Sequence, residues 1–119
     1  MEFNDILNIY LDFIKSNYDA LPVFIGQTPD ASSSHINIYP VSFNFSYERD
    51  NYSIALEIAL PETEIKDAIV YADDVAKVIE IDNLDECRLS TYAVEFYWNA
   101  QIAGTVIVFE INLFTERCR

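Results

Sequence analysis

Residues 41–60, VSFNFSYERDNYSIALEIAL, decide the fold of this chain. Large apolar side chains occupy alternate positions in two runs, first Val41, Phe43, Phe45 and Tyr47, then Tyr52, Ile54, Leu56, Ile58 and Leu60. Residues two apart lie on the same face of a strand, so both runs predict β-strands with one apolar face. The polar residues Glu48-Arg49-Asp50-Asn51 between the runs predict a turn. We therefore expect an antiparallel hairpin with one face packed on the core and the other face more exposed to solvent.

The segment before this hairpin predicts shorter extended pieces. The alternation from His35 to Tyr39 favours a strand, and Pro40 marks a bend or bulge at a sheet edge. Val23-Phe24-Ile25 is a short strand candidate that Gly26 ends. Residues 27–34 contain a proline and three consecutive serines, which is typical of an exposed loop.

Two amphipathic segments predict helices. Apolar residues recur three and four apart over 3–17, and Asn4 or Asp5 suits the first turn. The second predicted helix, 62–80, follows Pro61. Its expected core stripe consists of Ile65, Ala68, Ile69, Ala72, Val75, Ala76 and Ile79. Val70 and Val78 fall on the far side, where they are either incidental or a contact with another subunit.

A second strand pair closes the chain after an acidic connector, residues 82–86. The expected apolar faces are Tyr92, Val94, Phe96 and Trp98 on one strand and Ile107, Phe109, Ile111 and Leu113 on the other. Residues 99–104 predict the turn between them. The order of elements predicts one α+β domain over residues 1–119. In it, two helices pack on a mainly antiparallel sheet as a two-layer sandwich.

The charge is strongly negative and unevenly placed. The formal net charge is −13, and residues 57–86 carry ten acids against Lys66 and Lys77. Such a field disfavours nucleic acid as a direct partner. It favours either a solvated face, a surface complementary to a basic partner, or a mimic of nucleic acid. No apolar stretch is long enough to span a membrane, and no signal peptide is evident, so we expect a cytoplasmic location.

No pattern for catalysis or for a cofactor is present. His35, the single histidine, is expected at the surface or at an interface. Cys87 and Cys118 lack metal or redox spacing and are expected as reduced thiols, with a disulfide as the alternative. Residues 82–86 lack the turn glycine of a calcium loop and have no glutamate at the offset that bidentate binding requires, so no metal is expected. Without interleaved cations, the aromatic rows suit a core or a protein interface better than RNA.

Taken along nearly the whole chain, this order of elements resembles the tail terminator (tail-completion) family of long-tailed bacteriophages. The matching parts are the first helix, Phe3–Asn17, the long strand pair, His35–Leu60, the second helix, Glu62–Glu80, and the closing pair, Arg88–Phe114. The resemblance implies a non-enzymatic structural protein of the virion. It also implies a homohexameric ring that caps the tail tube and joins it to the head connector.

Two other interpretations remain open. One is a small acidic inhibitor, such as an anti-CRISPR or another nucleic-acid mimic, that binds a basic host protein in the host cytoplasm. The other is an immunity or adaptor protein that sequesters a basic toxin. In each case the expected function is protein–protein interaction. The candidate interaction residues are Glu48, Arg49, Asp50, Asn51, Glu64, Asp67, Asp74, Asn99 and Gln101.

Overall fold

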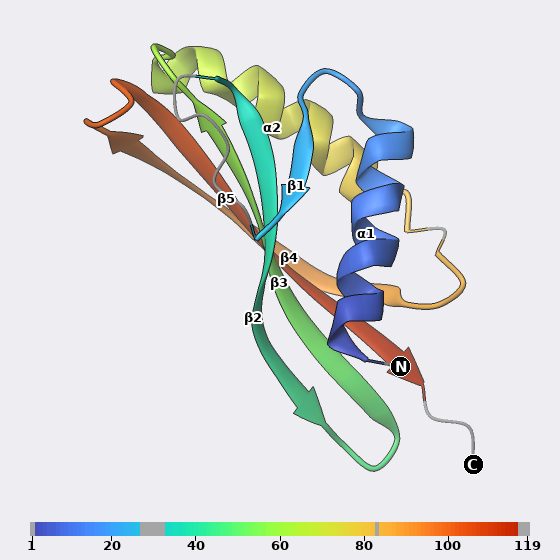
Figure 1. The fold of residues 1–119 in the computed structure, drawn as a ribbon. Helices are drawn as coiled ribbons and strands as arrows, with labels where there is room; N and C mark the ends of the chain where they lie inside the picture. Colours follow the sequence, from blue (N-terminus) through green and yellow to red (C-terminus); the bar gives the residue numbers. More distant parts are fainter. Residues whose placement is uncertain (1, 27–32, 83, 117–119) are drawn as a thin grey trace.

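The computed structural model describes residues 2–26, 33–82 and 84–116 (Figure 1). It confirms the predicted α+β class: two helices pack on one face of a five-stranded sheet with the order β1-β2-β3-β5-β4. Only β1 and β2 run parallel, and the other three pairs are antiparallel. The predictions for loop residues 27–32, for residue 83 and for Cys118 lie outside the described residues.

The elements follow the predicted order, but the strands are longer than the alternation alone indicates. The helices are α1 (Phe3–Asn17) and α2 (Ile65–Ile79), and the strands are β1 (Val23–Ile25), β2 (His35–Phe45), β3 (Arg49–Leu60), β4 (Arg88–Asn99) and β5 (Gly104–Glu116). The last strand in the sequence, β5, lies between β3 and β4. This placement leaves β4 at one edge of the sheet and β1 at the other.

The core lies between the helices and the central strands. The alternate apolar residues of β3 are all at most 1 % exposed, namely Tyr52, Ile54, Leu56, Ile58 and Leu60. The register pairs Leu56 with Phe109 of β5 and with Ile38 of β2, both fully buried. Each such side chain contributes about 1.5–3 kcal/mol by leaving water. The strand with neighbours on both sides therefore anchors the fold.

Helix α1 has the predicted bounds, and its apolar stripe faces the sheet. Its buried residues are Ile6, Leu7, Tyr10, Phe13 and Ile14. The carboxylate of Asp5 accepts a hydrogen bond of 3.0 Å from the backbone N–H of Glu2, which satisfies a donor at the helix start. Phe3, in the first turn, lies 5.3 Å from the Tyr52 ring and 5.8 Å from the Phe43 ring.

The predicted start of the second helix at residue 62 is wrong, because α2 begins at Ile65. Two hydrogen bonds fix the preceding connector instead: Glu62 N–H donates to the Ile102 carbonyl at 3.2 Å, and Thr105 Oγ1 donates to the Thr63 carbonyl at 2.8 Å. Glu62 has a φ of 56°, which cannot continue a right-handed helix. Contact with the β4–β5 turn therefore delays the helix by about one turn.

The buried face of α2 is also rotated from the predicted stripe. Ile65 and Ile69 are 42 % and 46 % exposed, whereas Val78, expected to point outward, is 7 % exposed. Ala68 and Ala72 sit at the centre of the contact with the sheet and are small enough for close approach. At 100° per residue, Val78 falls on one flank of this centre and the two isoleucines on the opposite flank. α2 packs on β5 and β4, and α1 packs beside it on β1 and β2 (Figure 1).

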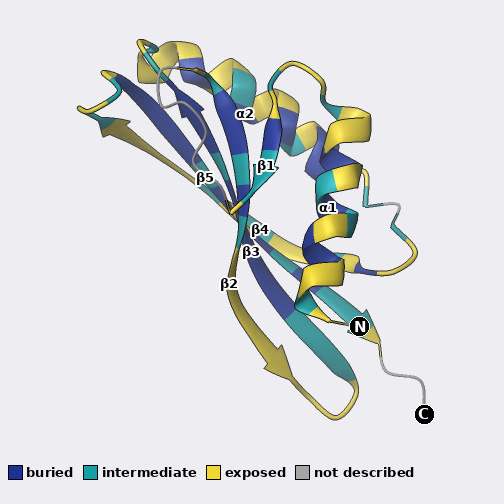
Figure 2. Ribbon diagram, in the orientation of Figure 1, coloured by how far each residue is buried: buried dark blue, intermediate teal, exposed yellow. Residues whose placement is uncertain are grey.

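The predicted hairpin is present, but its turn is shorter and its outer half is exposed. Arg49, Asp50 and Asn51, expected in the turn, belong to β3, and Ser46 closes the turn by donating to the Arg49 carbonyl at 2.8 Å. The apolar residues of the first predicted run are 46–78 % exposed, namely Val41, Phe43, Phe45 and Tyr47. The expectation that they line the core is wrong, because the hairpin extends beyond the helices (Figure 2).

Candidate protein interface

The predicted interaction residues lie at two opposite ends of the sheet. Strand register places Arg49 beside Glu116 at one end, and Leu60 beside Thr105 and Trp98 at the other. We call these the hairpin end and the turn end. The hairpin end contains Glu48, Arg49, Asp50 and Asn51, whereas the turn end contains Glu64, Asn99 and Gln101. Asp67 and Asp74 lie along α2, so the nine residues do not form one site.

The hairpin end presents aromatic side chains on the helix face of the sheet. We call Val41, Phe43, Phe45 and Tyr47 the hairpin patch. The Phe43 ring stacks on Tyr52 at 5.8 Å, and the Phe45 ring meets Phe43 edge-on at 4.5 Å. These ring contacts hold the aromatic side chains in place, so they form a preorganised apolar surface. On the opposite face, the guanidinium carbon of Arg49 lies 4.2 Å from the centre of the Phe114 ring.

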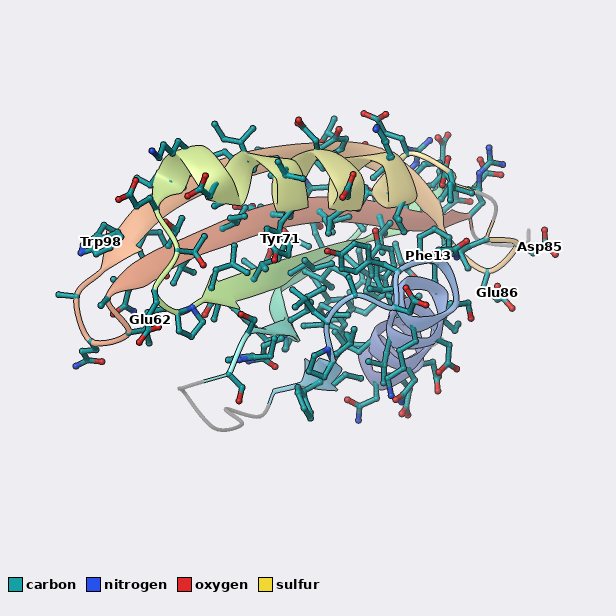
Figure 3. All side chains as sticks on the ribbon, turned by 90° about the horizontal axis from the view of Figure 1, so that it is seen from above. Phe13, Glu62, Tyr71, Asp85, Glu86 and Trp98 are labelled. Carbon is teal, nitrogen blue, oxygen red and sulfur yellow. The ribbon has the colours of Figure 1, made fainter. Side chains whose placement is uncertain are left out.

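The turn end presents a second apolar surface of different composition. Phe96 and Trp98 lie on the helix face of β4 and are 38 % and 51 % exposed. The exposed flank of α2, a helix that packs on β5 and β4, adds Ile65 and Ile69. We call these four residues the edge patch. Trp98 and Glu62 both lie at this end of the molecule (Figure 3).

Acidic side chains follow the outer surface of α2 and its connectors. The exposed acids between residues 62 and 86 are Glu62, Glu64, Asp67, Asp73, Asp74, Glu80, Asp85 and Glu86. Among them, Glu64 pairs with Lys66 at 3.5 Å, and both side chains are mostly exposed. An exposed ion pair of this kind contributes little to stability. The acids therefore form a solvated negative face rather than an internal network.

The face of the sheet opposite the helices, which we call the open face, is also polar and acidic. It carries Glu57, Glu95 and Glu110 on adjacent strands. Tyr39 donates a hydrogen bond of 3.0 Å to Glu57, and Ser53 donates one of 3.3 Å to Glu110. Burial, the nearby Glu57 charge and this hydrogen bond raise the pKa of Tyr39 to about 12. Phosphate groups would meet repulsion on this face.

Neither His35 nor Cys87 is positioned for chemistry. His35 is 7 % exposed, which corrects the surface expectation, and its Nδ1 lies 2.9 Å from the Ser33 carbonyl. His35 is buried because it lies in β2, where it pairs with Ala59 of β3. Cys87 is 1 % exposed, and burial, with the charges of Glu86 and Asp82, raises the pKa of its thiol to about 11. A protonated thiol is a poor nucleophile, so Cys87 acts as a small apolar side chain.

The metal and membrane criteria give negative findings within the described ranges. Over residues 2–26, 33–82 and 84–116, no three His, Cys, Asp or Glu side chains gather closely enough to hold a metal ion. No helix in the same ranges has the length and apolar character needed to cross a membrane.

No protein-family model matches the chain, and no curated protein sequence matches it.

Sequence reasoning missed the part of the edge patch that α2 contributes. Ile65 and Ile69 were assigned to the core stripe, whereas the aromatic row with Phe96 and Trp98 was assigned to a core or a protein interface. A signal was present in β5, where residues 106–109 are four consecutive apolar residues. Such a run is typical of a strand with both faces buried. It indicates that β5 is internal, which leaves β4 at the edge with part of its apolar face exposed.

Proposed function

We propose that this protein is a non-enzymatic structural subunit that assembles with copies of itself into a ring, as tail terminators of long-tailed phages do. The observation that carries the proposal is the pair of apolar patches at opposite ends of one sheet. Large contiguous apolar surfaces on a monomer usually mark contacts with other proteins. Here the two surfaces differ, because one is built on a hairpin and the other on a helix and an edge strand.

Two different patches favour a ring over a twofold dimer. In a twofold dimer the same surface contacts itself, whereas a contact between two different surfaces repeats from copy to copy. Such a head-to-tail series closes when the rotation between copies divides a full circle. The hairpin patch and the edge patch satisfy this requirement for two distinct surfaces.

The shape of the subunit suits a junction between two other proteins. The domain measures 50 × 23 × 22 Å, and its polar turns lie at the two ends of the long direction. Glu48 is exposed at one end, and Gln101 at the other. As the resemblance to tail terminators implies, such a ring would join the tail tube to the head connector. A phage virion is the location that this assembly implies.

The test is the mass of the protein in solution across a salt series. Light scattering should give a ring-sized mass rather than that of a 13.7 kDa monomer. Subunits with a net charge of −13 repel each other, so screening by salt should increase assembly. A protein that stays monomeric at high concentration from about 0.05 to 1 M salt, and also fails to bind tail-tube protein, would contradict the proposal.

The negative face on α2 supports a second candidate, an acidic inhibitor of a basic host protein. Such an inhibitor would be a monomer or dimer, and salt would weaken its complex instead of promoting assembly. Reversing Glu64, Asp67 and Asp74 to Lys, all exposed, should leave the fold intact. It should slow association with the basic partner about tenfold or more at low salt. Equal association rates for the wild type and the triple Lys variant across a salt series would rule out this role for the acids.

A further inference from the structure

A groove lies between α1 and the segment that joins α2 to β4, with a volume of about 350 Å³. Leu84 and Glu86 of that segment form one side. The other side consists of residues three and four apart along the second half of α1, namely Ile9, Asp12, Phe13, Ser16 and Asn17. Phe13 and Glu86 lie toward the opposite end of the molecule from Trp98 (Figure 3). The groove shares no residue with the hairpin patch or the edge patch.

The apolar part of the groove consists of Ile9, Phe13 and Leu84. Phe13 is 6 % exposed, and Ile9 and Leu84 are half-buried against the core. Arginine and lysine side chains bury their aliphatic stems along surfaces of this kind and keep the charged group in contact with polar atoms or water. The groove can therefore hold the stem of a long side chain.

The polar part of the groove presents hydrogen-bond acceptors. The exposed carboxylates of Asp12 and Glu86 lie on its two sides. Within the part of the chain that the structure describes, neither carboxylate forms an ion pair or a hydrogen bond. Asn17 donates a hydrogen bond of 2.8 Å from Nδ2 to the Phe13 carbonyl, which leaves its Oδ1 as an acceptor. These groups complement a ligand that is rich in donors.

The end of α1 adds to the negative potential of the groove. The helix ends at Asn17, and both Ser16 and Asn17 line the groove. The carbonyl groups of a last helical turn carry a partial negative charge that attracts cations. Lys15, the basic residue of the same turn, does not line the groove. Two carboxylates, a helix C-terminus and an apolar surface therefore converge on one place.

We propose that this groove binds an arginine side chain from a segment of a basic partner protein. The aliphatic stem lies against Phe13 and Leu84, and the guanidinium donates hydrogen bonds to the acceptors on both sides. A guanidinium has five N–H donors in one plane and is weakly hydrated, so it suits a partly buried site. The partner is a different protein rather than another copy, because each copy carries 20 acids, seven basic residues and a net charge of −13. This inference goes beyond the proposed ring and does not depend on it.

The first test is an NMR titration with a capped five-residue peptide that has one arginine between two leucines. The peptide should shift the backbone amide signals of residues 9–17 and of Leu84 and Glu86. A counterpart with citrulline, which keeps the shape and removes the charge, should not shift them. Raising the salt from about 0.05 to 0.5 M should weaken binding, because salt screens exposed charges. Shifts centred on α2 or on the open face would overturn the proposal.

The second test separates this groove from a general attraction to a negative protein. Asp12→Asn combined with Glu86→Gln should raise the dissociation constant of the arginine peptide about tenfold, because two ion pairs are lost. Asp73→Asn combined with Glu95→Gln makes the same charge change at exposed positions outside the groove. This control should change the dissociation constant less than about twofold. Circular dichroism checks that both variants are folded, and equal weakening by the two would overturn the proposal.

The outcomes separate this inference from the ring. A protein that stays monomeric in the salt series and fails to bind tail-tube protein, but binds the peptide in the groove, would overturn the ring and support the groove. A ring-sized oligomer whose groove signals do not respond to the peptide would support the ring and overturn the groove.

Discussion

β3 and the outer half of β2 carry the same alternation of large apolar residues, yet one is buried and the other exposed. Leu56 in β3 is fully buried, whereas Phe45 in β2 is 59 % exposed. The two strands pair with each other, so local sequence and backbone geometry do not explain the contrast. The difference lies in the neighbouring strands and helices. β3 has a strand on each side and helices above it, whereas the described strands pair with the outer half of β2 through β3.

The contrast teaches that alternation predicts a strand and its apolar face, but not what covers that face. In β3 the cover comes from the same chain. In the hairpin patch, the ring of Phe3 in the first turn of α1 lies 5.8 Å from the Phe43 ring, and Phe43 is still 46 % exposed. An apolar face that its own chain leaves exposed is the strongest indication that another chain covers it.

The largest expected effect contrasts the two flanks of α2. Val78→Asp should destabilise the protein by about 4 kcal/mol or more, because it buries an unpaired charge. Ile69→Asp, at a position that is 46 % exposed, should cost less than about 1 kcal/mol. Urea unfolding of the two variants measures both values. Equal destabilisation would mean that α2 packs with the face that the periodicity predicted.

The next effect compares β3 directly with the hairpin patch. Leu56→Ala should cost about 3–5 kcal/mol, since it leaves a cavity under the helices. Phe45→Ala should cost about 1 kcal/mol or less, because this side chain is already 59 % exposed in the folded protein. Thermal unfolding at low protein concentration, where assembly does not contribute, measures the loss of stability in each variant. Similar losses would show that the hairpin patch belongs to the core of the monomer.

A smaller effect tests the contact that fixes the turn end. A Cβ on Gly104 would lie 2.0 Å from the Leu60 carbonyl oxygen, so Gly104→Ala should cost roughly 1–3 kcal/mol through strain. Gly26 has a φ of 59° but open space around it, so Gly26→Ala should cost only about 1 kcal/mol. The denaturant midpoints of both variants provide the measurement. A neutral Gly104→Ala would show that the β4–β5 turn moves freely against the connector.

The smallest effect concerns Tyr39, where the covered part of β2 meets the uncovered part. Burial and the Glu57 carboxylate raise the pKa of Tyr39 from the ordinary value of 10.0 to about 12. The folded state therefore holds this proton more tightly than the unfolded state. The resulting stability is present below pH 10 and is lost as pH rises through 12. Tyr39→Phe should flatten the decline in stability between pH 9.5 and 11.5, measured by urea unfolding. An unchanged slope would mean that Glu57 does not hold the phenol.

Much of the fold could be predicted because its signals are local. Period-two runs predicted both strand pairs, and the stripe from Ile6 to Ile14 predicted α1 with correct bounds. The start of α2 was wrong because tertiary hydrogen bonds decide it. Glu62 and Thr63 bond to the β4–β5 turn, which is about forty residues away in the sequence. The helix propensity of the connector residues is a local property and does not depend on that contact.

The candidate interface was harder to predict because it depends on strand order. Choosing polar turn residues found Glu48 and Gln101 at the two ends, but missed the apolar residues beside them. Phe96 and Ile69 become surface residues only because β4 lies at the edge and α2 is rotated over it. Insertion of β5 next to β3 pairs segments about fifty residues apart, and a window along the sequence does not contain that information.

The register shift between Pro40 and Ser42 has a consequence for sequence length in this part of the chain. Before the shift, even-numbered residues such as Ile38 face the helices, and after it odd-numbered residues such as Phe43 do. Deleting a single codon at Val41 would remove the extra residue and with it the bulge, and every later side chain of β2 would keep its face. Phe43 would still pair with Tyr52 and face the helices. Deleting one residue from the regular part of the strand, with the bulge kept, would instead reverse the faces beyond that point, so single-residue length variants of this strand are expected at the bulge.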